Sequence, residues 1–274
     1  MSTKLTSALV VCVLVLGAAG AGIAKEREQD QAAAAGAGVL TAGPAGQFAG
    51  GGGPDRGSVT RVARRTASSA RVHATGGTVV TVRRGADVAL HGKPGGPALA
   101  TLGDRTPFGS RNALAVVRRR PGWLGVLSSL LHNGEVGWIR DDARTLTRSG
   151  NRVRIVVDRS DQRLELLRGK RRVMSVAVGV GRPGSETPTG RFAVTDRLSG
   201  ARYRGAYGCC VLALTGNQPR LPAGWRGGDR LALHGTAGRS APSARTAGCV
   251  AVDREPLERL VRSVPLGTVV TIRP

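Results

Sequence analysis

The most informative sequence is Leu233-His234-Gly235-Thr236, which a polar connection links to Thr246-Ala247-Gly248-Cys249-Val250. Each part places one reactive residue, His234 or Cys249, beside apolar residues typical of strands. A thiol attacks an acyl carbonyl only as its thiolate, so a reactive cysteine needs a base near it. His234 is the only histidine after His132, so it is the one imidazole that the C-terminal half offers. If the C-terminal half performs thiol chemistry with an imidazole from its own fold, His234 is the residue that supplies it.

The cysteine count supports a working thiol. Cys12 lies in the apolar N-terminal run, which leaves Cys209, Cys210 and Cys249, an odd number for an exported chain. A bridge between adjacent Cys209 and Cys210 would close a strained ring, so a small apolar role in a strand is the preferred interpretation. Two alternatives stay open. One of the two cysteines bonds Cys249 and silences it, or both join His234 and Cys249 at a zinc ion, although neighbouring strand residues point opposite ways.

The N-terminus predicts export. Lys4 precedes an apolar run from Ala8 to Ala24, so residues 1–24 are interpreted as a signal peptide or a retained membrane anchor. Residues 25–72 are rich in Ala, Gly, Ser and Thr and predict a disordered linker, because they bury too little apolar surface to fold. We expect an extracytoplasmic protein associated with the cell wall or membrane.

The chain of 274 residues carries a formal net charge of +23, spread over both of its halves. Charge this even does not indicate a nucleic-acid interface, and no recognition motif for nucleic acid accompanies it. Two interpretations remain compatible. Arg and Ala usage reflects base composition, or the charge attracts an anionic membrane or wall polymer.

Residues 73–148 predict a small β domain. Its short β-prone runs are separated by turn residues such as Pro94-Gly95-Gly96 and Asn133-Gly134. The expected strands are 78–82, 87–91, 98–102, 113–117, 123–126 and 136–140. Gly122-Trp123-Leu124-Gly125-Val126 and Gly137-Trp138-Ile139 resemble pieces of bacterial SH3-like modules. The resemblance implies a small SH3-like β-barrel, with Trp123 and Trp138 serving either peptidoglycan binding or the core.

Residues 151–274 predict a second, β-rich domain with one or two short helices. A hairpin is expected where Arg168-Gly169-Lys170 turns one strand into the next. A helix should begin near Asp253, with Pro256 in its first turn and an apolar face of Leu257, Leu260, Val261 and Val264. The expected strands are 153–158, 163–167, 173–180, 192–194, 211–214, 230–234 and 269–272.

Six sequence pieces in order within 152–274 resemble the L,D-transpeptidase catalytic domain, also called the YkuD domain. The pieces are Val156-Val157-Asp158 with Gln162-Arg163-Leu164, Val178-Gly179-Val180-Gly181, Glu186-Thr187-Pro188-Thr189-Gly190-Arg191-Phe192 with Tyr207-Gly208, His234-Gly235-Thr236, Gly248-Cys249-Val250, and Leu266-Gly267-Thr268-Val269-Val270-Thr271-Ile272. The resemblance implies a mostly β, sandwich-like catalytic domain. It implies a cysteine acyltransferase that joins peptidoglycan stem peptides by 3→3 cross-links, needs no metal or organic cofactor and is acylated by carbapenems.

The resemblance assigns Cys249 as the nucleophile and His234 as its activator. Gly248 lets the backbone approach the substrate closely, and the oxyanion is expected to bind the N–H of Cys249 and of Gly248 or Ala247. Thr246, Gly235 and Thr236 are predicted to support the site, the threonines either orienting the imidazole or satisfying loop backbone. Tyr207, Arg239 and Arg245 are candidate substrate-binding residues, although the two arginines also fit solvated loop charges.

Two positions depart from the usual pattern of the family. Ala247 stands where a histidine is usual, and Ala251 stands where arginine or asparagine is common. The histidine matching His234 is retained, which favours an active enzyme. The alternatives are a peptidoglycan-binding scaffold with weak or lost activity, and a hydrolase or protein-to-wall ligase of the same fold.

Overall fold

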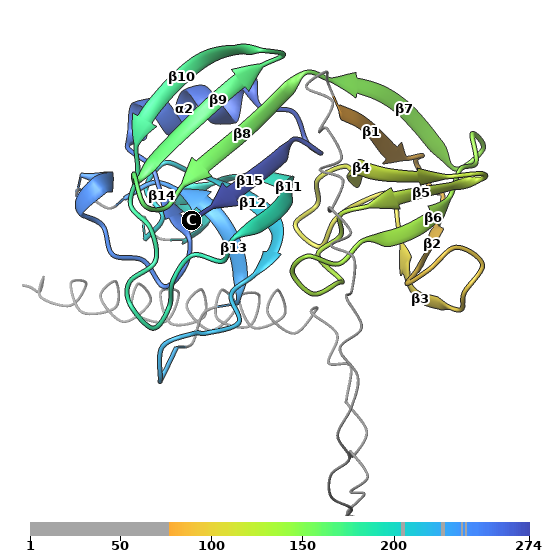
Figure 1. The fold of residues 1–274 in the computed structure, drawn as a ribbon, viewed down its shortest axis with the longest axis horizontal. Coiled ribbons are helices and arrows are strands. Elements are labelled where there is room, and N and C mark those ends of the chain that lie inside the picture. The colour runs from red at the N-terminus through yellow and green to blue at the C-terminus, as the bar shows by residue number, and fades with distance from the viewer. Residues whose placement is uncertain (1–76, 204–205, 226–227, 237, 239) are drawn as a thin grey trace, which may run out of the picture.

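The structure, a computed structural model, describes residues 77–203, 206–225, 228–236, 238 and 240–274. The predicted signal or anchor, the predicted linker and Arg239 lie outside the described residues. Two β lobes stand side by side, residues 77–151 in one and residues 153–274 in the other (Figure 1). The described chain is mostly β, as the sequence predicts.

The first lobe is one antiparallel sheet of seven strands in the order β3-β2-β6-β5-β4-β1-β7. Its strands are β1 (Gly77–Val82), β2 (Val88–His91), β3 (Ala98–Leu102), β4 (Ala113–Arg120), β5 (Trp123–Val126), β6 (Gly137–Arg140) and β7 (Leu146–Asn151). The first six match the expected strands closely, because each is a short apolar run between turn residues. Strand β7 is absent from the prediction, since most of it is exposed and polar.

Trp123 and Trp138 are both buried, so they are core residues of the first lobe. Arg140 stacks its guanidinium over the Trp123 ring, and the His91 ring meets the same ring edge-on. His91 also bonds the carbonyl of Gly96 at 2.7 Å, which places it at the turn after β2. The Trp123 ring is therefore covered by Arg140 and His91 of the same lobe.

The second lobe is a sheet of eight strands in the order β10-β9-β8-β15-β11-β12-β13-β14. The strands are β8 (Val153–Asp158), β9 (Arg163–Arg168), β10 (Arg171–Ala177), β11 (Gly190–Ser199), β12 (Cys210–Asn217), β13 (Arg230–His234), β14 (Val250–Ala251) and β15 (Val269–Arg273). Helix α2 (Arg254–Ser263) begins after Asp253, as expected, and two 3-10 turns, η1 (Gly200–Tyr203) and η2 (Ala241–Ser243), complete the lobe.

The eight strands curl around one hydrophobic core. Residues from β8 to β15 and from α2 belong to a single buried cluster, which requires the sheet to wrap around it. Leu257 and Leu260 of α2 are fully buried in this cluster and close it from one side. The curling leaves a second face of β11, β12 and β13 outside that core. Tyr207 and Cys249 pack against a separate small cluster on this face.

The two lobes are tightly connected. Only Arg152 separates β7 from β8, and the amide of Asn151 donates to the hydroxyl of Thr268 at 2.8 Å. Further along the junction, Asn133 and Asn217 exchange two hydrogen bonds, at 2.6 and 2.9 Å. A small apolar cluster also joins the lobes, formed by Ala115, Val117, Leu127, Ala193 and Val269.

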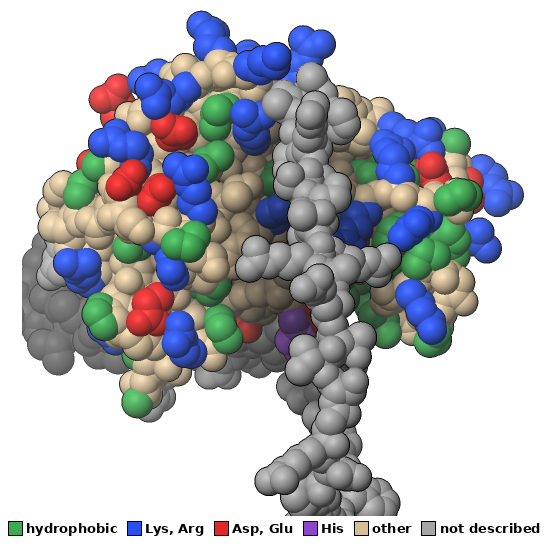
Figure 2. Space-filling view, in the orientation of Figure 1, with side chains coloured by type: hydrophobic (Ala, Val, Ile, Leu, Met, Phe, Trp, Pro, Cys, Tyr) green, Lys and Arg blue, Asp and Glu red, His purple; other side chains and the backbone are tan. Residues whose placement is uncertain are grey.

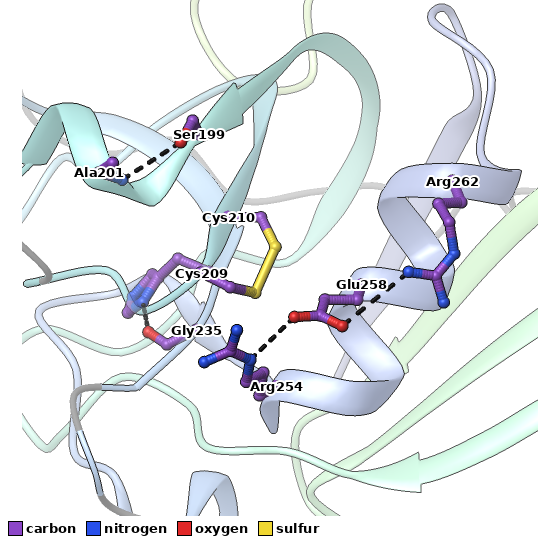
Figure 3. Close-up of a disulfide and its surroundings, with 9 residues drawn as sticks. Ser199, Ala201, Cys209, Cys210, Gly235, Arg254, Glu258 and Arg262 are labelled. Carbon is purple, nitrogen blue, oxygen red and sulfur yellow. Dashed lines mark hydrogen bonds and ion pairs between the residues drawn. A yellow bond between two sulfur atoms is a disulfide. The ribbon is translucent and has the colours of Figure 1, made fainter.

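Cys209 and Cys210 form a disulfide with each other, which corrects the expected apolar strand role (Figure 3). A bridge was not expected, because joining adjacent cysteines closes a strained ring. Strand β12 begins only at Cys210, and Gly208 before the pair has a φ of 64°, so Cys209 belongs to a turn. The bridge lies beside α2 and leaves Cys249 as the free cysteine of the described residues.

Lys and Arg side chains are spread over both lobes on the face shown in Figure 2. This distribution agrees with the even charge of the sequence. Within the described ranges, no helix is both long and apolar enough to cross a bilayer.

Candidate active site

The parallel pairing of β13 with β14 places Cys249 beside the strand that carries His234. Leu233 pairs with Val250, and His234 pairs with Ala251, so Cys249 immediately precedes the paired segment. The carbonyl of His234 also accepts the N–H of Val252 at 2.8 Å. Residues distant in sequence thus meet at one edge of the sheet.

The imidazole of His234 is buried and held by its neighbours. Its Nδ1 lies 2.7 Å from the carbonyl oxygen of Gly235, so Nδ1 carries the proton and Nε2 is the basic atom. The Tyr207 ring meets it edge-on, with 4.9 Å between the ring centres. Burial lowers the pKa of His234, while the bond to Gly235 acts in the opposite direction. The ring is therefore neutral near pH 7 and suited to accept a proton at Nε2.

The surroundings of Cys249 favour the protonated thiol over the thiolate. Its Sγ donates to the carbonyl oxygen of Arg230 at 3.8 Å. Burial raises the pKa of Cys249 to about 11, although a hydrogen bond with the backbone of Ala232 lowers it in part. Burial thus disfavours charge on both the thiol and the imidazole. Both groups are therefore uncharged near pH 7.

Alkylation of Cys249 by iodoacetamide should accelerate with pH up to about 11, because only the thiolate reacts. An ordinary cysteine would reach half of its maximal rate at about pH 8.5. Rates from peptide mass spectrometry of the Cys249 peptide between pH 6 and 11 measure this. A half-maximal rate below pH 9 would contradict the raised pKa of this half-buried thiol. The raised pKa also adds stability that is complete below the unfolded-state pKa and is lost as pH rises toward 11.

Two threonines hold the loop around Cys249. The Thr246 hydroxyl accepts the N–H of Gly248 at 3.1 Å and donates to the carbonyl of Cys249 at 2.6 Å. Thr187 reaches the same carbonyl at 3.5 Å and accepts the N–H of Gly181 at 2.8 Å. Thr246 therefore satisfies loop backbone, which is one of the two roles expected of it. Thr187 links the 186–192 sequence piece directly to the cysteine loop.

Gln218 also positions this loop, a role that its sequence context does not predict. Its buried Nε2 lies within hydrogen-bonding distance of three carbonyls: Ser185 at 3.3 Å, Glu186 at 3.1 Å and Ala247 at 3.1 Å. Its Oε1 accepts the N–H of Arg220 at 3.0 Å. One amide therefore joins the segment before β11 to the residue two positions before Cys249. A lone glutamine after an apolar strand carries no sequence signal for such a role.

Replacing Gln218 with leucine should lower the free energy of unfolding by about 1–3 kcal/mol, because buried carbonyls lose their donor. The acylation rate of Cys249 should fall together with the stability, since Ala247 is released. Urea unfolding and thiol acylation by a carbapenem measure the two effects. Gln162, at a turn outside this loop, provides the matched Gln→Leu control. Equal effects of the two substitutions would contradict a specific role for Gln218.

Residues 152–272 match the family model of the L,D-transpeptidase catalytic domain, YkuD. This match covers the second lobe, including His234 and Cys249. Comparison with curated proteins gives no match to this chain.

Solved structures similar to this chain include L,D-transpeptidases. The Bd1075 structure of Bdellovibrio bacteriovorus is 22% identical, with a TM-score of 0.37, and the match covers 44% of this chain and 48% of that one. L,D-transpeptidase 3 of Mycobacterium tuberculosis is 14% identical, with a TM-score of 0.36 and coverages of 51% and 74%. An L,D-transpeptidase of Stackebrandtia nassauensis is 18% identical, with a TM-score of 0.33 and coverages of 44% and 55%. This chain thus spans about half the length of the Bdellovibrio protein.

The remaining predicted residues of the YkuD domain fall into two groups. Tyr207 and Gly235 both contact His234, through its ring and through Nδ1. Thr236 is half-buried directly after them, whereas Arg245 is exposed, as a solvated loop charge would be. Arg239 lies outside the described residues.

The zinc alternative does not fit the YkuD domain, because the sulfurs of Cys209 and Cys210 are bonded to each other. Among the described residues, no three His, Cys, Asp or Glu side chains gather to hold a metal ion. A separate cleft of about 410 Å³ lies at the lobe junction, away from the predicted site residues. It is lined by Val79, Thr81, Arg111, Ala113, Ser149, Arg197, Arg262, Ser263, Val264, Pro265 and Leu266.

Proposed function

We propose that this protein is an exported peptidoglycan L,D-transpeptidase that forms 3→3 cross-links through a thioester on Cys249. The family match of residues 152–272 supports the reaction class. The observation that carries the residue assignment is the β13–β14 pairing, which brings the His234 strand and the Cys249 loop together. The apolar run before Ala24 supports export.

In the first half-reaction, Nε2 of His234 takes the proton of Cys249 as Sγ attacks the donor stem. The attacked carbon is the carbonyl of diaminopimelate, at its bond to the terminal D-alanine. The carbon–nitrogen bond breaks, and D-alanine leaves with the proton returned by His234. In the second half-reaction, the amine of an acceptor stem attacks the thioester and loses a proton to His234. Cys249 leaves as thiolate and recovers that proton.

The oxyanion of each tetrahedral intermediate needs backbone donors near Cys249. The N–H of Gly248 already donates to the Thr246 hydroxyl, so it holds the loop instead. We assign the oxyanion to the N–H groups of Cys249 and Ala247. Gln218 fixes Ala247 by donating to its carbonyl at 3.1 Å.

Ala251 fits the space that it occupies. It is fully buried, and its N–H and carbonyl both bond Gly179 at 2.9 Å. A longer side chain at this position would have to displace core atoms. The replacement of the family's usual arginine or asparagine is therefore compatible with a well-packed cysteine loop.

Incubation with a disaccharide-tetrapeptide tests the reaction. A transpeptidase yields free D-alanine and a cross-linked dimer, both absent from the Cys249→Ala variant. Tripeptide without dimer would instead assign a hydrolase. A dimer formed only with a protein amine would assign a ligase. Unchanged tetrapeptide in the presence of folded protein would favour the scaffold alternative.

We further propose that the positive charge holds the protein at anionic wall polymer or membrane. Exposed charges are screened within about 8–10 Å at physiological salt, so this attraction should weaken as salt rises. Co-sedimentation with purified cell wall between 50 mM and 1 M NaCl measures it. Binding that is insensitive to salt would contradict an electrostatic origin.

A further inference from the structure

A loop of the first lobe reaches the sheet face that carries His234. The loop joins β3 to β4, and its Phe108 packs against a small buried cluster on β11, β12 and β13, formed by Leu198, Val211 and Ala232. Tyr207 and Cys249 pack against the same cluster. Phe108 is one of only three phenylalanines in the chain. The first lobe therefore places a scarce aromatic residue in the cluster that holds the thiol.

The loop that carries Phe108 forms a hydrogen-bonded turn. The N–H of Gly109 donates to the carbonyl of Thr106 at 2.9 Å, and Gly109 has a φ of 90°. Pro107 takes the second position of this turn and fixes its backbone. The N–H of Ser110 donates to the Thr106 hydroxyl at 3.2 Å. These bonds hold Phe108 at a set position, so its packing on the second lobe needs no ordering of a loose segment.

Thr106 anchors this turn to the second lobe. Its hydroxyl donates to Oδ1 of Asp196, a fully buried residue of β11. The other oxygen, Oδ2, has no hydrogen-bond partner among the described residues. A buried carboxylate with so few donors depends strongly on each of them. The second lobe therefore relies on Thr106 for a bond made close to the site.

We propose that the β3–β4 loop forms one wall of the Cys249 site and that Phe108 restricts the size of the groups that reach the thiol. The first lobe then serves as part of the acyl-donor site. This role goes beyond wall binding. The claim that Phe108 selects among acyl groups rests on the proposed function. The claim that Phe108 limits access to the thiol does not.

Two reagents with the same reactive group but different size test the wall. Iodoacetamide and a fluorescein iodoacetamide both react with the thiolate, so a change in thiol pKa affects both rates alike. Phe108→Ala should raise the rate at which the bulky reagent alkylates Cys249 by about 10-fold. The rate with iodoacetamide should rise by less than about 3-fold. A tenfold change corresponds to about 1.4 kcal/mol of activation free energy. Phe108→Leu should lie between wild type and Phe108→Ala, and covers the case in which the alanine variant does not fold.

Leu127→Ala is the matched control. Leu127 is a buried apolar residue of the same lobe junction, but it packs in the cluster around Ala115 and Ala193. It should leave the ratio of the two rates unchanged. The proposal is overturned if folded Phe108 variants keep the wild-type ratio, or if Leu127→Ala changes the ratio equally.

The same variants separate this inference from the proposed function. If the wall exists but the protein is not a transpeptidase, the alkylation ratio changes while carbapenem acylation and dimer formation are absent. If the protein is a transpeptidase without this wall, acylation occurs and the ratio stays constant. Thr106→Val should shift the ratio in the direction of Phe108→Ala, because it releases the turn from Asp196.

Discussion

Replacing His234 with glutamine is expected to slow acylation of Cys249 by about 10²–10⁴-fold, the usual contribution of a positioned general base. Burial raises the pKa of Cys249 to about 11, so few thiolates exist near pH 7 without a base. His234 offers Nε2 as that base because Nδ1 is committed to the carbonyl of Gly235. A time course of carbapenem adduct formation by intact mass measures the rate.

The residual rate of the His234→Gln variant should rise with pH, because hydroxide then replaces the imidazole as proton acceptor. His91→Gln is the matched control, since His91 also bonds a backbone carbonyl, that of Gly96, but in the first lobe. It should acylate at the wild-type rate. Wild-type acylation by a folded His234→Gln protein would remove His234 from the mechanism.

Gly248→Ala is expected to destabilise the second lobe by about 2–4 kcal/mol and to abolish most acylation. Gly248 has a φ of 120°, a conformation that residues with a side chain rarely adopt. A Cβ at this position would also overlap the Nε2 of Gln218, which is buried and bonded to three carbonyls. The backbone strain and the overlap both arise at the residue directly before Cys249. Urea unfolding and adduct formation measure them together.

The double variant Gly248→Ala with Gln218→Ala separates the two causes. Removing the Gln218 amide relieves the overlap but leaves the unfavourable backbone, so the double variant should be more stable than the sum of the single effects. Gly150→Ala is a control, because a Cβ there has open space and the residue has an ordinary φ. Unchanged stability of Gly248→Ala would contradict the loop geometry.

The strands and the helix were predictable because their signals are local. Apolar and polar residues alternate in 153–158, and this alternation predicts the buried positions of β8. The helical spacing of Leu257 and Leu260 likewise predicts the buried face of α2. Strand β14 was missed because it has only two residues, and β7 because its exposed positions outnumber its buried ones. The adjacency of the His234 strand and the Cys249 loop was inferred through family resemblance, since parallel pairing across 16 residues leaves no local pattern.

Parts of the site that depend on distant contacts could not be predicted. Gln218 acts through carbonyls far away in sequence, and nothing in its own neighbourhood indicates them. Phe108 joins the Cys249 cluster from the other lobe, so its residue type alone suggests an ordinary core position. The Cys209–Cys210 disulfide was not predicted, because a bridge between adjacent cysteines was expected to close a strained ring.

The central claim is that Cys249 is the nucleophile, and acylation by a carbapenem tests it most directly. The protein purified without its N-terminal 24 residues and Cys249→Ala of the same length are incubated with the drug, and their intact masses are compared. We expect one adduct per wild-type molecule, carried by the Cys249 peptide, and none on the variant. No adduct on folded wild-type protein, or the same adduct on Cys249→Ala, would contradict the account.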